Sequence, residues 1–139
     1  MERDGTNYQL ARTSADYKAC HEFLKASNTE YCGKLKFPTF IAKRDDKIVA
    51  VMGTHPTDKM ILVEPLEIQV EGNPSFLMQR LVNLYEGLLV SSGVSTYRFR
   101  IRKEHDRYLN VIRQLPELYK ELEPENNSSE FAWFERRLQ

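Results

Sequence analysis

One segment of the sequence, residues 60–103, constrains the fold more than any other. It contains a predicted strand at Met60 to Val70, a turn at Gly72-Asn73-Pro74, a helix from about Ser75 to Ser91, and a strand at Ser95 to Lys103. The helix places four leucines at i, i+4, i+7 and i+11, which is one face of a 3.6-residue period: Leu77, Leu81, Leu84 and Leu88. The segment predicts an α+β (α/β) fold in which this long helix packs against a sheet.

The rest of the chain supplies further strands and helices, recognised by their periodicity and by the turn residues between them. We expect a strand at 8–10, a helix at 13–26, a short helix or loop at 28–36, a hairpin at 38–56 that turns at 44–47, a short helix after 105, and a closing hairpin at 118–138. Ser14 is the predicted N-cap of the first helix and Asp106 that of the short one. Without repeats or a linker, residues 1–139 are expected to form a single domain.

Composition excludes several classes of protein. Lys plus Arg (20) balances Asp plus Glu (20), and the pI near 6.8 does not favour a dedicated nucleic-acid binder. No apolar run approaches the roughly 20 residues that span a bilayer, so we expect a cytoplasmic protein without membrane contact. Cys20 and Cys32 lack a CxxC partner and are expected to be reduced thiols. No spacing of ligands predicts a metal.

The order of the elements, which ends in strand, turn, long helix, strand, short helix and hairpin, resembles the GNAT-type N-acetyltransferase fold from about Tyr8 to Leu138. The resemblance implies a mixed, mostly antiparallel sheet with splayed central strands, flanking helices and a closing β-hairpin. It also implies that acyl-CoA lies between the diverging strands at 60–70 and 95–103, with its pyrophosphate on the turn before the long helix.

The family forms that turn with a motif of the type Q/R-x-x-G-x-G/A, in which backbone N–H groups at a helix N-terminus face the phosphates. By resemblance, the residues that would hold the cofactor are Ile68, Val70, Gly72, Asn73 and Ser75. The turn here departs from the motif, because it has one glycine, Pro74 has no N–H, and Glu71 adds negative charge. Phe76 or Leu77 stands where the family keeps a small residue.

These departures predict a degenerate acyl-CoA loop and a protein that acts by binding a protein partner. The chain is also similar in size and closing hairpin to small GNAT-like proteins of short-tailed bacteriophages. That similarity implies virion assembly or binding of a host factor, in the host cytoplasm or the virion.

The alternative is a working acyl-CoA-dependent N-acetyltransferase that acts on a protein or a small amine, with acetyl-CoA as cofactor. The resemblance then implies Glu67 as the base and Tyr108 as the acid, which meets the general acid–base requirement. A tyrosine at helical spacing also suits core packing, and both interpretations stay open here.

A second alternative depends on the strand Ser95 to Lys103, in which Arg98, Arg100 and Arg102 share one face. Three neighbouring guanidinium groups require solvent or acidic partners, and the candidates are Glu64, Glu67 and Glu130. Otherwise the face binds a phosphate, a nucleic acid or an acidic protein.

The last predicted strand carries an aromatic cluster. Phe131 and Trp133 are expected on one face of this strand and Phe134 on the other. An uncovered face would form an interface with a protein partner or with a second copy of the chain, so a homodimer is one expectation.

Overall fold

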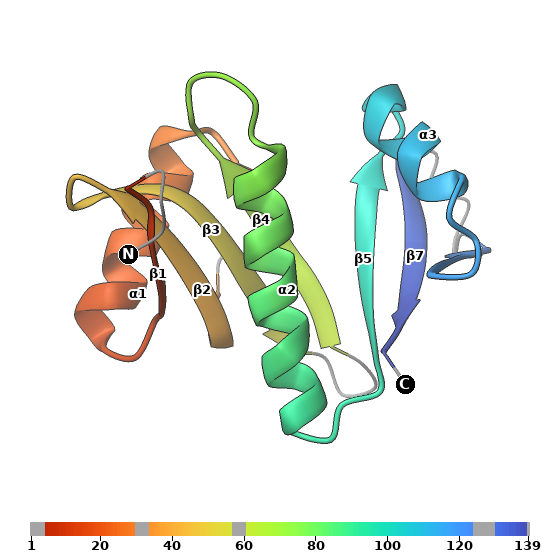
Figure 1. Ribbon diagram of the computed structural model, residues 1–139, viewed down its shortest axis with the longest axis horizontal. Helices are drawn as coiled ribbons and strands as arrows, with labels where there is room; N and C mark the ends of the chain where they lie inside the picture. Colours follow the sequence, from red (N-terminus) through yellow and green to blue (C-terminus); the bar gives the residue numbers. More distant parts are fainter. Residues whose placement is uncertain (1–4, 30–33, 57–60, 124–129, 139) are drawn as a thin grey trace.

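The computed structural model describes residues 5–29, 34–56, 61–123 and 130–138, which form one seven-stranded sheet with helices on both faces (Figure 1). In chain order the elements are β1 (Asn7–Leu10), α1 (Ser14–Ala26), β2 (Lys36–Arg44), β3 (Lys47–Pro56), β4 (Ile61–Ile68), α2 (Ser75–Ser91), β5 (Thr96–Arg102), α3 (Asp106–Arg113), β6 (Tyr119–Leu122) and β7 (Phe131–Arg137). The predicted α+β fold is confirmed. The short helix or loop expected at 28–36 lies largely outside the described residues.

Two predicted helix caps are wrong. The N-cap of α1 is Thr13, whose side chain accepts a hydrogen bond from the Asp16 N–H, while the Asp16 carboxylate accepts from the Thr13 N–H. This reciprocal pair is a capping box, and it makes Ser14 the first helical residue. In α3 the N-cap is His105, without a side-chain cap bond, and Asp106 follows it as the first helical residue. A carboxylate there still interacts favourably with the helix dipole.

The strands follow the order β1-β2-β3-β4-β5-β7-β6, and all neighbours are antiparallel except β4 and β5. β4 and β5 run parallel and share a single registered pair, Leu62 with Arg98. From there the two strands diverge toward the end of the sheet at which α2 begins (Figure 1). The splay of the central strands that the resemblance implied is therefore present.

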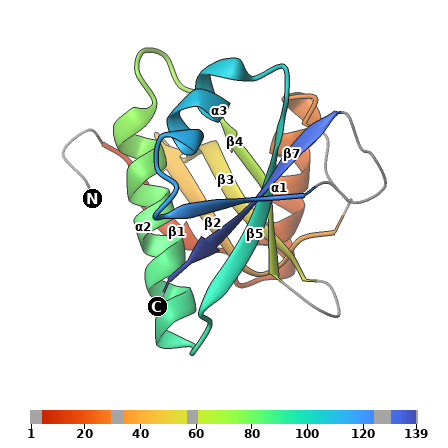
Figure 2. The same cartoon turned by 90° about the vertical axis from the view of Figure 1, so that its right-hand side faces the viewer.

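Helices cover the two faces of the sheet unequally. α1 packs on Ile41 and Val51, at the β2 and β3 half. α2 packs on the opposite face, and α3 covers Ala132 and Phe134 farther along that face (Figures 1 and 2). None of the helices in the described ranges is both long and apolar enough to cross a membrane.

The buried face of α2 differs from the predicted one. Its fully buried residues follow one i, i+4 row and are Leu77, Leu81, Tyr85 and Leu89. Leu84 and Leu88 are only partly buried and flank that row. Tyr85 belongs to the core because its ring packs on Phe40 and Tyr97, and because its hydroxyl shares a hydrogen bond with Thr54 of β3.

Candidate functional site

The splay between β4 and β5 coincides with an irregularity in β4. From the pair Thr54–Val63 to the pair Met52–Leu66, β4 advances three residues (63 to 66) while β3 advances two (54 to 52). The additional residue forms a β-bulge, which breaks the regular ladder where β4 has separated from β5. Pro65 is buried within this bulge and has no N–H to donate.

The turn before α2 is held by its own side chains. Gly72 has φ +83°, a left-handed conformation that glycine adopts without strain. The Asn73 Oδ1 accepts a hydrogen bond of 2.9 Å from the Ser75 N–H. Pro74 is the N-cap, and the first helical hydrogen bond runs from the Met78 N–H to the Pro74 carbonyl at 2.9 Å. The N–H groups of Ser75 and Met78 thus have partners in the turn and in the helix. Of the first helical N–H groups, those of residues 76 and 77 are left to face outward.

The side chains in and after this turn differ in their exposure to solvent. Leu77 is 2% exposed and belongs to the core, so it does not occupy the space of a phosphate. Phe76 is 61% exposed, and Glu71 is also exposed. An anion approaching this helix end would therefore meet a carboxylate and an exposed aromatic ring.

The residues expected to hold the pantetheine lie at the end of β4. Ile68 is the last residue of β4 and pairs with Ala50, while the Gln69 N–H donates to the Val49 carbonyl at 2.7 Å. The side chains of Ile68 and Val70 are half-buried and pack on the core beneath α2. Their position near the splay agrees with the resemblance, and their role as a cofactor site stays a prediction.

The predicted acid and base lie on different elements. Glu67 pairs with Val51, and because Val51 packs against α1, Glu67 lies on the α1 face of the sheet. Its Oε1 accepts a hydrogen bond from the Gln69 Nε2 at 3.2 Å. Tyr108 lies in the first turn of α3, and its side chain is outside the described part of the structure. α3 and the turn before α2 lie at the same end of the sheet (Figures 1 and 2).

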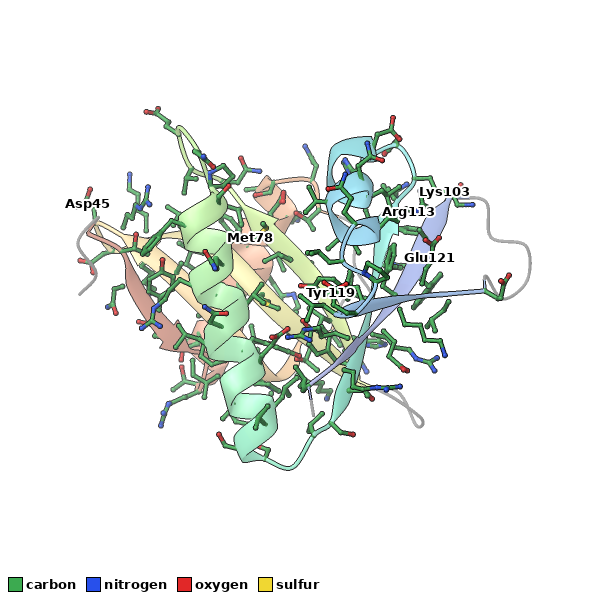
Figure 3. All side chains as sticks on the ribbon, turned by 45° about the vertical axis from the view of Figure 1, so that its right-hand side comes forward. Asp45, Met78, Lys103, Arg113, Tyr119 and Glu121 are labelled. Atoms are coloured by element: carbon green, nitrogen blue, oxygen red, sulfur yellow. The ribbon has the colours of Figure 1, made fainter. Side chains whose placement is uncertain are left out.

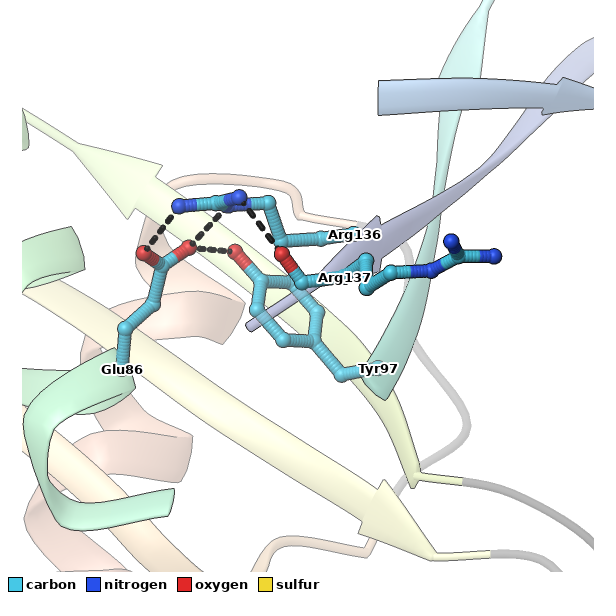
Figure 4. A network of polar contacts seen from close by, with 4 residues as sticks. All are labelled: Glu86, Tyr97, Arg136 and Arg137. Atoms are coloured by element: carbon cyan, nitrogen blue, oxygen red, sulfur yellow. Dashed lines mark hydrogen bonds and ion pairs between the residues drawn. The ribbon is translucent and has the colours of Figure 1, made fainter. Parts of the chain in front are cut away.

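A polar network that the sequence analysis missed connects α2 to the far side of the splay (Figure 4). The Glu86 carboxylate of α2 accepts hydrogen bonds from the Tyr97 hydroxyl at 2.5 Å and from Arg136 Nε and Nη2 at 3.1 and 3.2 Å. The Arg136 side chain is 19% exposed and that of Glu86 13%. Since Tyr97 belongs to β5 and Arg136 to β7, this carboxylate joins the helix to both strands. No local pattern marks Glu86, because its partners lie 11 and 50 residues away.

The network perturbs the groups within it. Burial, and then the hydrogen bond to Glu86, raise the pKa of Tyr97 well above its ordinary value. Burial by itself would lower the pKa of Arg136. The hydrogen bonds and the opposite charge of the Glu86 carboxylate have a larger combined effect, so the pKa of Arg136 is raised. Tyr97 therefore stays a neutral phenol beside the Glu86–Arg136 ion pair. A satisfied polar network of this kind stabilises the contact between the elements that it joins.

One arginine of the β5 face, Arg98, has a partner other than the predicted glutamates. Arg98 forms an ion pair with Glu135 of β7, with 3.3 Å between Nε and Oε2. Glu135 is not one of the three glutamates that were expected to pair with this face. The Arg100 guanidinium lies 4.1 Å from the centroid of the Phe131 ring and 5.8 Å from that of Trp133. As predicted, Phe131 and Trp133 share a face, and Phe134 is buried on the other.

Other polar groups serve the structure. Arg113 of α3 and Glu121 of β6 form a two-bond ion pair at 2.8 and 2.9 Å on the exposed surface (Figure 3). Cys20 is fully buried against β2 and β3, and burial raises the pKa of its thiol to about 12. Cys32 lies outside the described residues. Within those residues, His, Cys, Asp and Glu side chains form no group that could hold a metal ion.

Comparisons with known proteins identify the fold. No protein-family model matches the sequence, and no curated protein matches it significantly. Among solved structures, the ribosomal-protein-S18-alanine N-acetyltransferase from Escherichia coli is 14% identical with a TM-score of 0.68, over 96% of this chain and 94% of that one. An acetyltransferase of the GNAT family from Staphylococcus aureus Mu50 is 10% identical with a TM-score of 0.70, over 96% and 99%.

A third structure contains a ligand. PaiA N-acetyltransferase from Thermoplasma acidophilum, in complex with coenzyme A, is 11% identical with a TM-score of 0.59, over 88% of this chain and 71% of that one. At these identities the likeness shows the fold alone. The chain therefore has the GNAT-type N-acetyltransferase fold, as the order of its elements predicted.

Proposed function

We propose that this chain is a GNAT-fold protein that acts by binding a protein partner and does not transfer an acetyl group. The observation that carries the proposal is the turn before α2. Ser75 gives its N–H to Asn73, Pro74 has none to give, and Glu71 is exposed beside them. Within the first turn of α2, a pyrophosphate would have only the N–H groups of residues 76 and 77 as donors, and Glu71 would be a carboxylate neighbour.

The charges strengthen this argument. The first turn of α2 contains no basic side chain, and a dianionic pyrophosphate beside a carboxylate experiences repulsion that the helix dipole offsets by only about 0.3–1 kcal/mol. The residues present therefore do not fit high-affinity binding of acyl-CoA. The likeness to small GNAT-like proteins of short-tailed bacteriophages supports a role in virion assembly or in binding a host factor.

A thermal-shift titration with acetyl-CoA tests the proposal, with desulfo-CoA and ATP as controls. A ligand that binds only the folded state stabilises it by about 2.7 kcal/mol at 100 times its Kd, which is a shift of several degrees. We expect no saturable shift at millimolar acetyl-CoA. A saturable shift with both CoA compounds, and none with ATP, would overturn the proposal.

A gain-of-function variant makes the same test sharper. Glu71→Gln combined with Pro74→Gly removes the repulsive charge and restores one N–H donor. If the turn limits binding, this variant should shift with acetyl-CoA where the wild-type chain does not. Glu71→Gln alone serves as the matched control, because it removes the same charge without adding a donor.

The second candidate is an acyl-CoA-dependent N-acetyltransferase, and the observation that favours it is the splay. β4 and β5 share one registered pair and then diverge, as the cofactor site of the fold requires. An acyl-CoA bound there would supply the acetyl thioester, Glu67 would accept the proton of the amine, and Tyr108 would donate one to the thiolate. If turnover of an amine is found, Tyr108→Phe should lower kcat by roughly 10²-fold, and a change below about threefold would exclude this role.

A further inference from the structure

β4 has an open edge on the side that faces the splay. Its register with β5 consists of Leu62 opposite Arg98, and no strand in the described ranges pairs with the rest of this edge (Figure 1). The bulge and Pro65 interrupt the edge, so its regular part begins at Leu66 and ends with the strand at Ile68. A strand with such an edge is a template on which another extended chain can pair.

The pairing of β4 with β3 decides which backbone groups face the splay. The Gln69 N–H donates to the Val49 carbonyl, so the pair that the preceding Ile68 forms with β3 is a non-hydrogen-bonded one. The two kinds of pair alternate along an antiparallel ladder, so Leu66 also forms a non-hydrogen-bonded pair with β3. The backbone N–H and C=O of Leu66 and Ile68 therefore point away from β3, toward the splay. Each residue offers one donor and one acceptor there, at a spacing of roughly 7 Å along the strand.

Exposed apolar side chains lie beside this edge on the α2 side of the sheet. Leu66 pairs with the core residue Met52 beneath α2, so its side chain points to that side, and it is 39% exposed. Phe76, in the first turn of α2, is 61% exposed, and Val111 of α3 is 55% exposed. α2 begins at this end of the sheet, and α3 lies there too (Figures 1 and 2). A segment added to β4 would present every second side chain to this apolar side.

The charges beside the splay do not favour a segment of either sign. β4 contains Glu64 and Glu67, and β5 contains Arg100 and Arg102, so the formal charges of these four residues cancel. Both arginines also have interactions within the chain, including ring contacts with Phe131. The backbone groups and the apolar side chains are therefore what this edge offers to a partner.

The outer edges of the sheet are less suited to the addition of a strand. β1 and β6 have four residues each. The two central residues of β6 are Lys120 and Glu121, and charged side chains of this kind keep edge strands from pairing with other chains.

We propose that the open edge of β4 binds an extended polypeptide segment of the protein partner, which joins the sheet as a strand beside Leu66 and Ile68. Its backbone exchanges hydrogen bonds with these two residues, and its alternate apolar side chains contact Leu66 and Phe76. This inference rests on the proposed function, since it names the kind of partner and the place where that partner binds. The pantetheine arm of an acyl-CoA also carries amide groups, but its pyrophosphate does not fit the turn before α2, so a polypeptide is the favoured occupant.

Fluorescence anisotropy tests the inference with a short labelled peptide that alternates valine and serine. The same peptide with proline in place of each serine is the control probe, because proline has no N–H and does not extend a sheet. The test variant is Leu66→Asp. Its matched control is Leu118→Asp, because Leu118 is 37% exposed and lies just before β6, away from the splay. Thermal unfolding checks the fold of each variant, and Leu66→Ser replaces Leu66→Asp if that one does not unfold cooperatively.

Amide hydrogen exchange, followed by NMR, tests the register. In the free protein the N–H groups of Leu66 and Ile68 should exchange faster than that of Gln69, which donates to Val49. In the saturated peptide complex these two groups should exchange more slowly, and the exchange of Gln69 should not change.

We expect saturable binding of the valine-serine peptide that Leu66→Asp weakens by about tenfold, whereas Leu118→Asp stays within about twofold. Absence of binding at millimolar peptide, equal binding of the proline peptide, an equal loss in both variants, or unchanged exchange of Leu66 and Ile68 would each overturn the inference. The acetyl-CoA titration decides the proposed function separately. If neither acetyl-CoA nor the peptide binds, only this inference fails, whereas a saturable shift with both CoA compounds refutes the proposed function.

Discussion

Replacing Glu86 with glutamine should weaken the connection between α2 and the strands beyond the splay. The carboxylate accepts three hydrogen bonds, one from Tyr97 and two from Arg136. Glutamine keeps the size of the side chain but has one acceptor oxygen, and its amide N–H groups would face the N–H groups of Arg136. The arginine would then remain 19% exposed without its counter-charge.

The magnitude follows from the burial of this pair. Removing one member of a fully buried ion pair costs about 3–5 kcal/mol. Here both side chains retain some solvent contact, and Arg136 keeps a hydrogen bond of 2.8 Å to the Arg137 carbonyl. We therefore expect the free energy of unfolding to fall by about 2–3 kcal/mol, which lowers the Tm by roughly 6–12 °C in a chain of this size.

Urea and thermal unfolding measure this loss, and Glu121→Gln is the matched control. Glu121 makes a geometrically similar pair with Arg113, but the two side chains are 44% and 45% exposed. Exposed pairs contribute little, so the control should change the Tm far less. Arg136→Met, alone and combined with Glu86→Gln, completes a double-mutant cycle that isolates the coupling free energy between the two side chains. If Glu86→Gln destabilises the protein no more than Glu121→Gln does, the network does not hold α2 to β5 and β7.

Three further predictions concern the core and a helix end. Thr13→Ala removes half of the capping box and should lower the free energy of unfolding by about 1 kcal/mol in urea denaturation, whereas Thr13→Ser should restore it. In a Cys32→Ser variant, the buried Cys20 thiol, with a pKa raised to about 12, should not react with Ellman's reagent until the protein unfolds, and reaction in the folded protein would contradict its burial. Burial also raises the pKa of Tyr85 from 10.0 to about 12, so the folded state keeps this proton longer than the unfolded chain. Its contribution to stability is complete below pH 10 and is lost as the pH rises toward 12, and Tyr85→Phe should make urea midpoints fall less over that range.

Local patterns predicted the elements well because helices and short turns depend on near neighbours. The helix expected from about Ser75 to Ser91 has those bounds, and the hairpin predicted around residues 44–47 turns at Asp45 and Asp46. Both aspartates have positive φ, which short polar side chains tolerate. The alternation along β5 likewise predicted which of its residues face the core, since successive side chains of a strand point to opposite faces.

The sequence could not predict which distant residues meet. In the structure β7 lies between β5 and β6, and the short β6 forms the edge of the sheet. Nothing in the periodicity of β7 predicts this order. A homodimer through an edge strand would therefore use β6 or β1, and dimerisation stays a prediction. The same limit applies to Glu86 and Arg136, which lie 50 residues apart and pair only after both halves of the sheet have formed.

The candidate site divides in the same way. The composition of the turn at Gly72-Asn73-Pro74 and the shared face of the β5 arginines were evident from the sequence, because they depend on single residues and on their spacing. The tertiary structure, by contrast, brought Arg98 and Glu135 together. It also placed Phe131 under the other two arginines. Ion pairs and ring contacts between strands depend on distances that the packing of the whole sheet creates, and no local period encodes those distances.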